Sequence, residues 1–255
     1  MSLNQHRGPC QMINYLANLL SVLSLLCGFF SITFALTRVH YTYAAWAIIL
    51  SVIFDGLDGR VARLNPVPSE FGKQLDSLID VVSFGVAPSL LGYVFIYERF
   101  HLWAVLVLFF YLLCSIWRLA KYNLTPKESM HYHFWGLPTT ISGGLLASFI
   151  LIYRRKGEMF FPGFMPDILM ADNLRVMFLV LAFILGVLMV SRVKFLNLDG
   201  IKKVLGRNIG LTIAVLSVLM AVAAFRRDAG IAAFTLFLVY VLFSPIAVKE
   251  LENSK

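Results

Sequence analysis

Four aspartates within residues 55–80 are the side chains whose type and spacing could do chemistry. Asp55 and Asp58 lie three residues apart, Asp76 and Asp80 lie four apart, and long apolar runs flank the whole stretch. Positions three or four apart share one face of a helix. Carboxylates are costly to bury unless they are compensated. The spacing therefore predicts two helix faces that each present a pair of carboxylates to a common partner.

The connection between the two pairs predicts how they meet. Pro66 and Pro68, in the segment "NPVPSEFG" at 65–72, do not allow a helix to continue. We therefore expect two antiparallel helices whose four carboxylates converge. Like charges in a partly desolvated site repel unless a cation neutralises them, and oxygen ligands favour Mg²⁺, Mn²⁺ or Ca²⁺. Four carboxylates can hold two divalent ions, an arrangement common in phosphoryl chemistry.

Small residues and one arginine beside the aspartates fit a phosphate substrate. Gly56, Gly59, Ala62 and Gly72 would let a ligand approach the backbone, and Arg63 could meet a phosphate with its planar guanidinium. Separately, glycines in a membrane helix also serve packing, and intramembrane carboxylates also form ion or proton pathways. The regular spacing of the whole array favours the metal site over these readings.

The elements that must position these residues are membrane helices. The chain has 255 residues, of which 59% are hydrophobic and 14% charged, with a mean hydropathy of +0.79. A bilayer-spanning helix needs about 20 mostly apolar residues. We predict an all-α integral membrane protein, a polytopic helical bundle of about eight transmembrane helices. Their expected ranges are 11–36, 44–63, 74–97, 102–122, 138–153, 175–192, 210–225 and 229–248.

The net charge of +8 is explained by topology, without a nucleic-acid partner. With the N-terminus in the cytoplasm, the connections on that side carry more Lys and Arg than those on the other side, as the positive-inside rule requires. The aspartates then lie at the cytoplasmic interface. The basic segment 192–208 could touch anionic lipid headgroups or could be a topology signal alone. We expect one membrane domain over residues 1–255.

The order Asp55-x2-Asp58-Gly59-x2-Ala62-Arg63-x8-Gly72-x3-Asp76-x3-Asp80 resembles the signature of the CDP-alcohol phosphotransferases at every position. The resemblance implies a membrane enzyme that moves a substituted phosphoryl group from a CDP-linked donor to an alcohol and releases CMP. It implies that the four aspartates bind two ions, Mg²⁺ or Mn²⁺, and that Asp80 is also the general base. The CDP-lipid would lie against Asn18, Ser21, Gly59, Ala62, Arg63, Ser69 and Gly72.

Three further segments indicate the alcohol. "VVSFGVAPS" at 81–89, "RLAKYN" at 118–123 and "FWGLP" at 134–138 resemble the membrane-embedded phosphatidylserine synthase branch of that family. That branch implies CDP-diacylglycerol as the donor and L-serine as the acceptor. Arg118 and Lys121 would meet the serine carboxylate, with Asn123 as a polar contact; for the two cations the alternative is anchoring at the membrane surface.

The resemblance covers roughly residues 12–200, so the helices expected at about 209–248 are additions to the catalytic core. It implies a location in a bacterial inner membrane, an active site that faces the cytoplasm, and contact with membrane lipids. It is also compatible with a homodimer. Three alternatives stay open: a sibling enzyme using glycerol phosphate or an inositol compound, an ether-lipid donor, and a carboxylate-based ion or proton transporter.

Overall fold

The computed structural model describes residues 7–37, 41–64, 70–96, 101–124, 133–156, 167–197, 200 and 229–253. Within them, seven of the eight predicted segments are helical, and the segment predicted at 210–225 lies outside the described residues. The helices are α1 (Arg7–Leu36), α2 (Tyr41–Ala62), the continuous α3 (Glu70–Asp80), η1 (Val81–Val86) and α4 (Ala87–Ile96), α5 (His101–Leu124), α6 (Thr139–Lys156), α7 (Asp167–Val190) and α10 (Ala229–Asn253).

Five stretches of these helices are long and apolar enough to cross a membrane: Met12–Leu36, Glu70–Ile96, Leu102–Leu124, Asn173–Val190 and Ala229–Lys249. A sixth apolar helix, Thr139–Ile152, is shorter. Helix α2 is apolar in its first half but ends in the charged sequence from Asp55 to Arg60. The all-α membrane class is therefore confirmed, whereas the count of eight spans is not.

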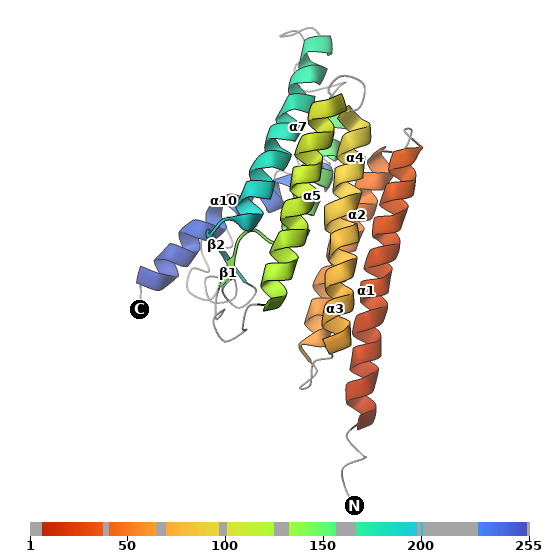
Figure 1. Ribbon diagram of the computed structural model, residues 1–255, viewed down its shortest axis with the longest axis vertical. Coiled ribbons are helices and arrows are strands. Elements are labelled where there is room, and N and C mark those ends of the chain that lie inside the picture. Colours follow the sequence, from red (N-terminus) through yellow and green to blue (C-terminus); the bar gives the residue numbers. More distant parts are fainter. Residues whose placement is uncertain are drawn as a thin grey trace, which may run out of the picture.

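Most of the helices stand side by side, α10 runs obliquely to them, and the last residues of α2 and α5 and the first of α3 lie at the same end of the bundle (Figure 1). Helix α1 packs along α2, α5 packs against α7, and α6 packs against both α2 and α10. Helices α2 and α3 run antiparallel, as expected (Figure 1), while Pro66 and Pro68 lie outside the described residues. This end of the bundle also holds the two strands.

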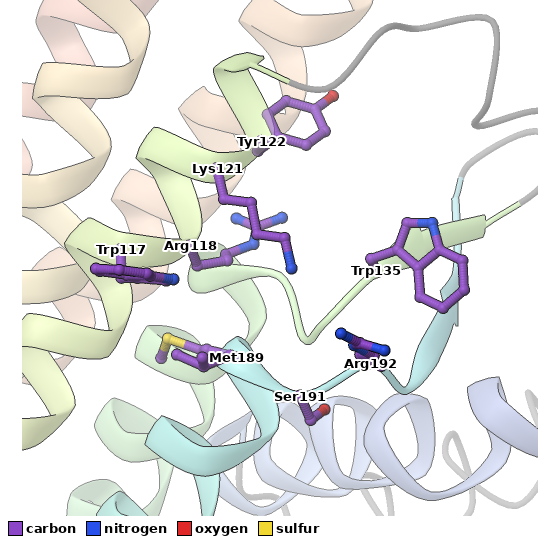
Figure 2. Close-up of a pocket in the computed structure, with 9 residues that line it drawn as sticks. Trp117, Arg118, Lys121, Tyr122, Trp135, Met189, Ser191 and Arg192 are labelled. Carbon is purple, nitrogen blue, oxygen red and sulfur yellow. The ribbon is translucent and has the colours of Figure 1, made fainter.

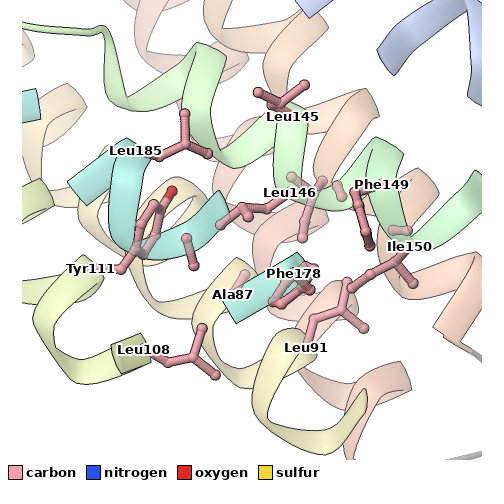
Figure 3. Packing of buried hydrophobic residues seen from close by; sticks show 14 of the residues in the cluster. Ala87, Leu91, Leu108, Tyr111, Leu145, Leu146, Phe149, Ile150, Phe178 and Leu185 are labelled. Carbon is pink, nitrogen blue, oxygen red and sulfur yellow. The ribbon is translucent and has the colours of Figure 1, made fainter. Parts of the chain in front are cut away.

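The core of the bundle is apolar and is centred on α4, α5, α6 and α7 (Figure 3). Tyr111, Phe84 and Phe178 are among its largest fully buried side chains. The one polar atom of Tyr111 is satisfied there, since its hydroxyl donates to the carbonyl oxygen of Phe84 at 3.0 Å and lies 3.1 Å from Ser142 Oγ. This core fixes the helices whose polar ends build the site.

A π-helical segment, η1, interrupts the α-helical pattern directly after Asp80. The amide of Ala87 donates to the carbonyl oxygen of Val82, five residues back. Ser83 lies in this segment, is fully buried, and donates through Oγ to the carbonyl oxygen of Ser24 at 3.3 Å. A side chain at Gly28 would collide with Ser83, so α1 approaches the π-helical segment closely.

Two short strands, β1 (His133–Trp135) and β2 (Lys194–Leu196), pair in antiparallel register, with Phe134 opposite Phe195. Both strands lie in connections between the helices that the sequence predicted, where no strand was expected. Helix α10 supports the pair, because the Tyr240 hydroxyl donates to the carbonyl oxygen of Leu196 at 2.7 Å and the Leu196 amide donates to Ser244 Oγ. The last helix therefore contacts the sheet next to the aspartate end of the bundle.

Gly136, directly after β1, has a φ of +78°, in the left-handed region. Its amide donates to the carbonyl oxygen of Val193 at 2.8 Å, and a Cβ at this position would run into the carbonyl oxygen of Met189. Only glycine fits both the conformation and the space. The turn leads straight into the first residues of α6.

We predict that Gly136→Ala destabilises the protein, because an L-residue in the left-handed region costs roughly 1–2 kcal/mol and the added methyl group would also displace the end of α7. The thermal unfolding midpoint in detergent should fall. Gly59→Ala is the matched control, since nothing lies within 4 Å of a Cβ there. An unchanged midpoint for Gly136→Ala would contradict this account of the turn.

Candidate active site

Three of the four aspartates form a compact cluster at the end of the bundle. Asp55 comes from α2 and Asp76 and Asp80 from α3, and one carboxylate oxygen of each lies within 4.8 Å of the others. Asp55 is two turns before the end of α2, and the other two occupy one face of α3. The antiparallel turn between the helices brings these faces together, as the spacing predicted.

Asp58 lies outside this group of three although it belongs to the same helix face. It is buried, and its Oδ2 accepts a hydrogen bond of 2.7 Å from Ser21 Oγ on α1. Asp58 still interacts electrostatically with Asp76 and Asp55, so it borders the cluster. The structure thus connects the predicted nucleotide residue Ser21 directly to one of the predicted metal ligands.

The donor set of the cluster fits a hard cation. Among the described residues, the Oδ1 atoms of Asp76 and Asp80 are buried without a hydrogen-bond partner from the protein. Buried carboxylate oxygens are normally hydrogen-bonded or bound to a cation, because burying them uncompensated is costly. Oxygen ligands alone suit Mg²⁺ or Mn²⁺. The group can therefore bind a divalent metal ion, with Asp55 as its third ligand.

A buried arginine from α5 lies beside the acidic cluster. Arg118 is only 9% exposed and interacts electrostatically with Asp80 and Asp55. Its Nη1 donates to Thr139 Oγ1 at 3.0 Å, and its guanidinium carbon lies 5.6 Å from the centre of the Tyr122 ring. One cation at this depth offsets part of the repulsion among the carboxylates.

Arg118 also lines a pocket of about 380 Å³ between the end of α5, β1 and the end of α7. Lys121 and Arg192 line it as well, and their side chains reach toward the same space from opposite sides (Figure 2). The remaining lining residues are mostly aromatic or apolar and include Trp117, Tyr122, Trp135 and Met189. The pocket therefore presents cations within an apolar wall, and Arg118 joins it to the aspartates.

Asn123 holds the end of α5 against α3. Its side-chain Nδ2 donates to Ser77 Oγ at 2.8 Å. Its backbone carbonyl oxygen accepts a hydrogen bond from Lys73 Nζ at 3.4 Å. Asn123 was expected near the acceptor alcohol, but it is not among the residues that line the pocket. In the part of the chain that the structure describes, its side-chain amide is engaged in joining two helices.

The residues expected around the CDP-lipid take different positions. Gly59, Ala62 and Arg63 are exposed along the last turn of α2 and just beyond it, whereas Asn18 and Gly72 are half-buried on α1 and α3. Ser69 lies outside the described residues. A Cβ at Gly56 or Gly59 would meet nothing within 4 Å, so open space adjoins this side of α2.

Sequence reasoning missed two threonines at the start of α6. Thr140 Oγ1 donates to Asp55 Oδ2 at 3.2 Å, and Thr139 accepts from Arg118 as described above. It also missed Arg192 and Trp135 as lining residues of the pocket. The threonines directly follow the "FWGLP" segment. Their place next to a segment that resembles the family was the signal that could have identified them.

Comparisons with known proteins agree with this geometry. A sequence model of the CDP-alcohol phosphatidyltransferase family matches residues 14–188. A CDP-diacylglycerol–serine O-phosphatidyltransferase of Helicobacter pylori is 33% identical over 232 residues, which are 91% of this chain and 91% of that protein. Proteins of the same name from Saccharomyces cerevisiae and Methanocaldococcus jannaschii are 38% and 34% identical over 57% and 58% of this chain, and over 56% and 61% of their own lengths.

Proposed function

The chain is an enzyme of the CDP-alcohol phosphatidyltransferase family, and from this membership we propose that it transfers the phosphatidyl group of CDP-diacylglycerol to L-serine, giving phosphatidylserine and CMP. The observation that carries the proposal is the cluster of Asp55, Asp76 and Asp80 beside a buried Arg118, which itself lines a cationic pocket. The activity for which these relatives are named supports serine as the acceptor.

Asp55, Asp76 and Asp80, with Asp58 at their border, are the residues that would hold Mg²⁺ or Mn²⁺, and four carboxylates suffice for two ions. Bound divalent cations neutralise the pyrophosphate of the donor and make CMP a better leaving group. Ser21 and Thr140 each hold one carboxylate oxygen in place by a hydrogen bond. The carboxylates of Asp58 and Asp55 are therefore already oriented by the protein before a substrate binds.

The donor would approach the open side of α2. Gly56 and Gly59 leave room for its pyrophosphate, Arg63 is exposed one turn further on, and Ala62 keeps the same side of the helix small. Ser21 would border this region from α1 through its bond to Asp58. Asn18, Gly72 and Ser69 are proposed from their places in the sequence alone. Arg63 would pair with phosphate oxygens through its planar fork.

The chemical step is a direct displacement at the phosphorus that carries the diacylglycerol group. The serine hydroxyl oxygen forms a bond to that phosphorus as the bond to the CMP oxygen breaks, and the hydroxyl proton passes to Asp80. The role is proposed from the place of Asp80 in the signature; one of its carboxylate oxygens would hold the cation and the other would take the proton. A positioned carboxylate that accepts a proton during attack acts as a general base.

The acceptor would lie in the pocket that Arg118 shares with the acidic cluster. The Arg118 guanidinium would pair with the serine carboxylate, and Lys121 would be a second cation at the exposed edge of the pocket. Asn123, which does not line this pocket, would act from a distance by holding the end of α5 against α3 through its bond to Ser77. A charged ligand bound between Arg118 and aromatic side chains is well oriented, because both charge and shape restrict it.

A second candidate acceptor is favoured by one observation. Arg192 joins Arg118 and Lys121 around the same pocket, so three cationic side chains line it. A phosphorylated alcohol such as glycerol phosphate or an inositol phosphate carries more negative charge than serine and would use the third cation. The same fold and the same donor chemistry would serve this sibling reaction.

The membrane helices and the charge bias support a proposal for the location of the chain. The apolar helices support an integral membrane protein, and the excess of Lys and Arg on the aspartate side supports a site that faces the cytoplasm. We propose a bacterial inner membrane as its location, with lipid on all sides of the bundle. A homodimer is compatible with this placement.

The proposed reaction is tested by giving the purified full chain Mg²⁺ or Mn²⁺, CDP-diacylglycerol and labelled serine, glycerol phosphate, inositol or inositol phosphate in separate assays. We expect CMP release and a labelled lipid with serine. Repeating the serine assay with an ether-linked donor tests donor preference. Release with a phosphorylated acceptor but not with serine would replace serine by the second candidate, and no turnover with any pair would leave an ion or proton transporter.

Asp80→Asn should lower CMP release by about 100-fold or more, because it removes the proton acceptor, while CDP-diacylglycerol binding is largely retained. Asp76→Asn is the matched comparison, since it removes a carboxylate from the same cluster but not the base, and it should weaken Mn²⁺ binding measured by electron paramagnetic resonance. Full activity of Asp80→Asn would refute its role as the base.

Arg118→Ala should raise the KM for serine by about 10-fold or more, because it removes a buried charged hydrogen-bonding group. The KM for CDP-diacylglycerol should change little. Arg60→Ala, which removes an exposed cation at the end of α2, is the control and should leave both values unchanged. An unaltered serine KM in Arg118→Ala would take this residue out of the acceptor pocket.

A further inference from the structure

The first two residues of α6 contact two different parts of the candidate active site. Thr139 Oγ1 accepts a hydrogen bond of 3.0 Å from Nη1 of Arg118 on α5. Thr140 Oγ1 donates one of 3.2 Å to Oδ2 of Asp55 on α2. Because the two threonines are neighbours in the chain, a single peptide unit joins the arginine of the pocket to an aspartate of the acidic cluster.

The position of these two hydroxyl groups is set by the fold around them. The preceding residues are held by backbone hydrogen bonds from Gly136 to Val193 at 2.8 Å and from Leu137 to Leu188 at 3.1 Å. Gly136 occupies a conformation and a space that exclude other residues. The end of α7 and the turn after β1 therefore hold the start of α6 in place.

Helix formation alone does not explain the two contacts. A threonine at the start of a helix usually bonds to the backbone of its own helix, whereas these two hydroxyls reach α5 and α2. Thr139 is fully buried, and Arg118 is 9% exposed, so their hydrogen bond lies out of water. A charged group at this depth needs partners, and the hydroxyl supplies one whose direction is fixed.

We propose that Thr139 and Thr140 are positioning residues that hold the acceptor-binding arginine and a metal-binding aspartate at a fixed separation. Thr139 acts on the acceptor through Arg118, and Thr140 acts on the cation through Asp55. The start of α6 would then set the position of the arginine that orients the alcohol relative to the carboxylate that would hold the cation. This inference rests on the proposed function for what Arg118 and Asp55 bind.

The test uses the full chain in detergent and separates the two threonines. Thr139→Val removes the acceptor of the Arg118 hydrogen bond with little change of shape and should raise the serine KM by about 10-fold, leaving Mn²⁺ affinity unchanged. Thr140→Val should weaken Mn²⁺ binding, measured from the resonance of free Mn²⁺, by about 10-fold, because it removes a hydrogen bond that orients a ligand. Its serine KM at saturating Mn²⁺ should stay near that of the unaltered chain.

Thr139→Ser and Thr140→Ser are the matched controls, since each restores a hydroxyl and should restore the corresponding value. In an Arg118→Ala background, Thr139→Val should add nothing to the serine KM. If a valine variant shows no cooperative thermal unfolding transition and is therefore not folded, the alanine variant at that position is tested in its place. Equal effects of both valine variants on both readouts, or unchanged readouts, would overturn the proposal.

Failure of the proposed function gives a different pattern. If the unaltered chain does not use serine, the KM measurements are made with the acceptor that it does use, and the Mn²⁺ measurement needs no acceptor. A selective loss of Mn²⁺ affinity in Thr140→Val would then support the positioning role while the choice of serine fails. An unchanged serine KM in Thr139→Val together with an unchanged Mn²⁺ affinity in Thr140→Val would refute positioning, while serine turnover by the unaltered chain would leave the proposed reaction intact.

Discussion

The aspartate end of the bundle depends on one electrostatic constraint, the packing of carboxylates closer together than their charges allow unaided. Two unit charges about 4 Å apart interact by about 4 kcal/mol at an effective dielectric constant of 20, and three carboxylates lie within 4.8 Å of one another here. One guanidinium, that of Arg118, cannot offset them all. A bound cation would neutralise the remaining negative charge of the carboxylates. The same cation would attract a phosphate ester, so one ion would serve both the stability of this end and substrate binding.

The sequence predicted the parts of this arrangement that depend on local periodicity. Asp55 with Asp58 and Asp76 with Asp80 fall on helix faces because of their spacing, and the apolar runs locate seven of the helices. It could not predict that Asp58 turns to Ser21, or that Thr139 and Thr140 contact Arg118 and Asp55. Those contacts join segments between 21 and 85 residues apart, and they depend on how helices pack.

The pairing of β1 with β2 shows the same limit and has a structural effect. Strands of three residues carry too little alternation to be recognised, yet they bring Trp135 and Lys194 together, with Nζ 5.2 Å from the ring centre. Helix α10, beyond the part of the chain that the family model matches, contacts β2 through Tyr240 and Ser244. A helix outside the matched residues thereby supports the strand pair whose Trp135 lines the pocket.

The π-helical segment between Asp80 and α4 has a consequence for variation in chain length. A π-helical turn accommodates one residue more than an α-helical turn, and each residue of an α-helix advances the side-chain direction by about 100°. Loss of one residue within Val81–Val86 could be absorbed by reversion to α-helix, with the aspartates and the core residues of α4 both keeping their faces. Loss of one residue between Asp76 and Asp80 has no such reserve and would turn Asp76, with everything before it in α3, by about 100° relative to Asp80 and the helices beyond. Tolerance to deletion should therefore change abruptly at the residue where the π-helical segment begins.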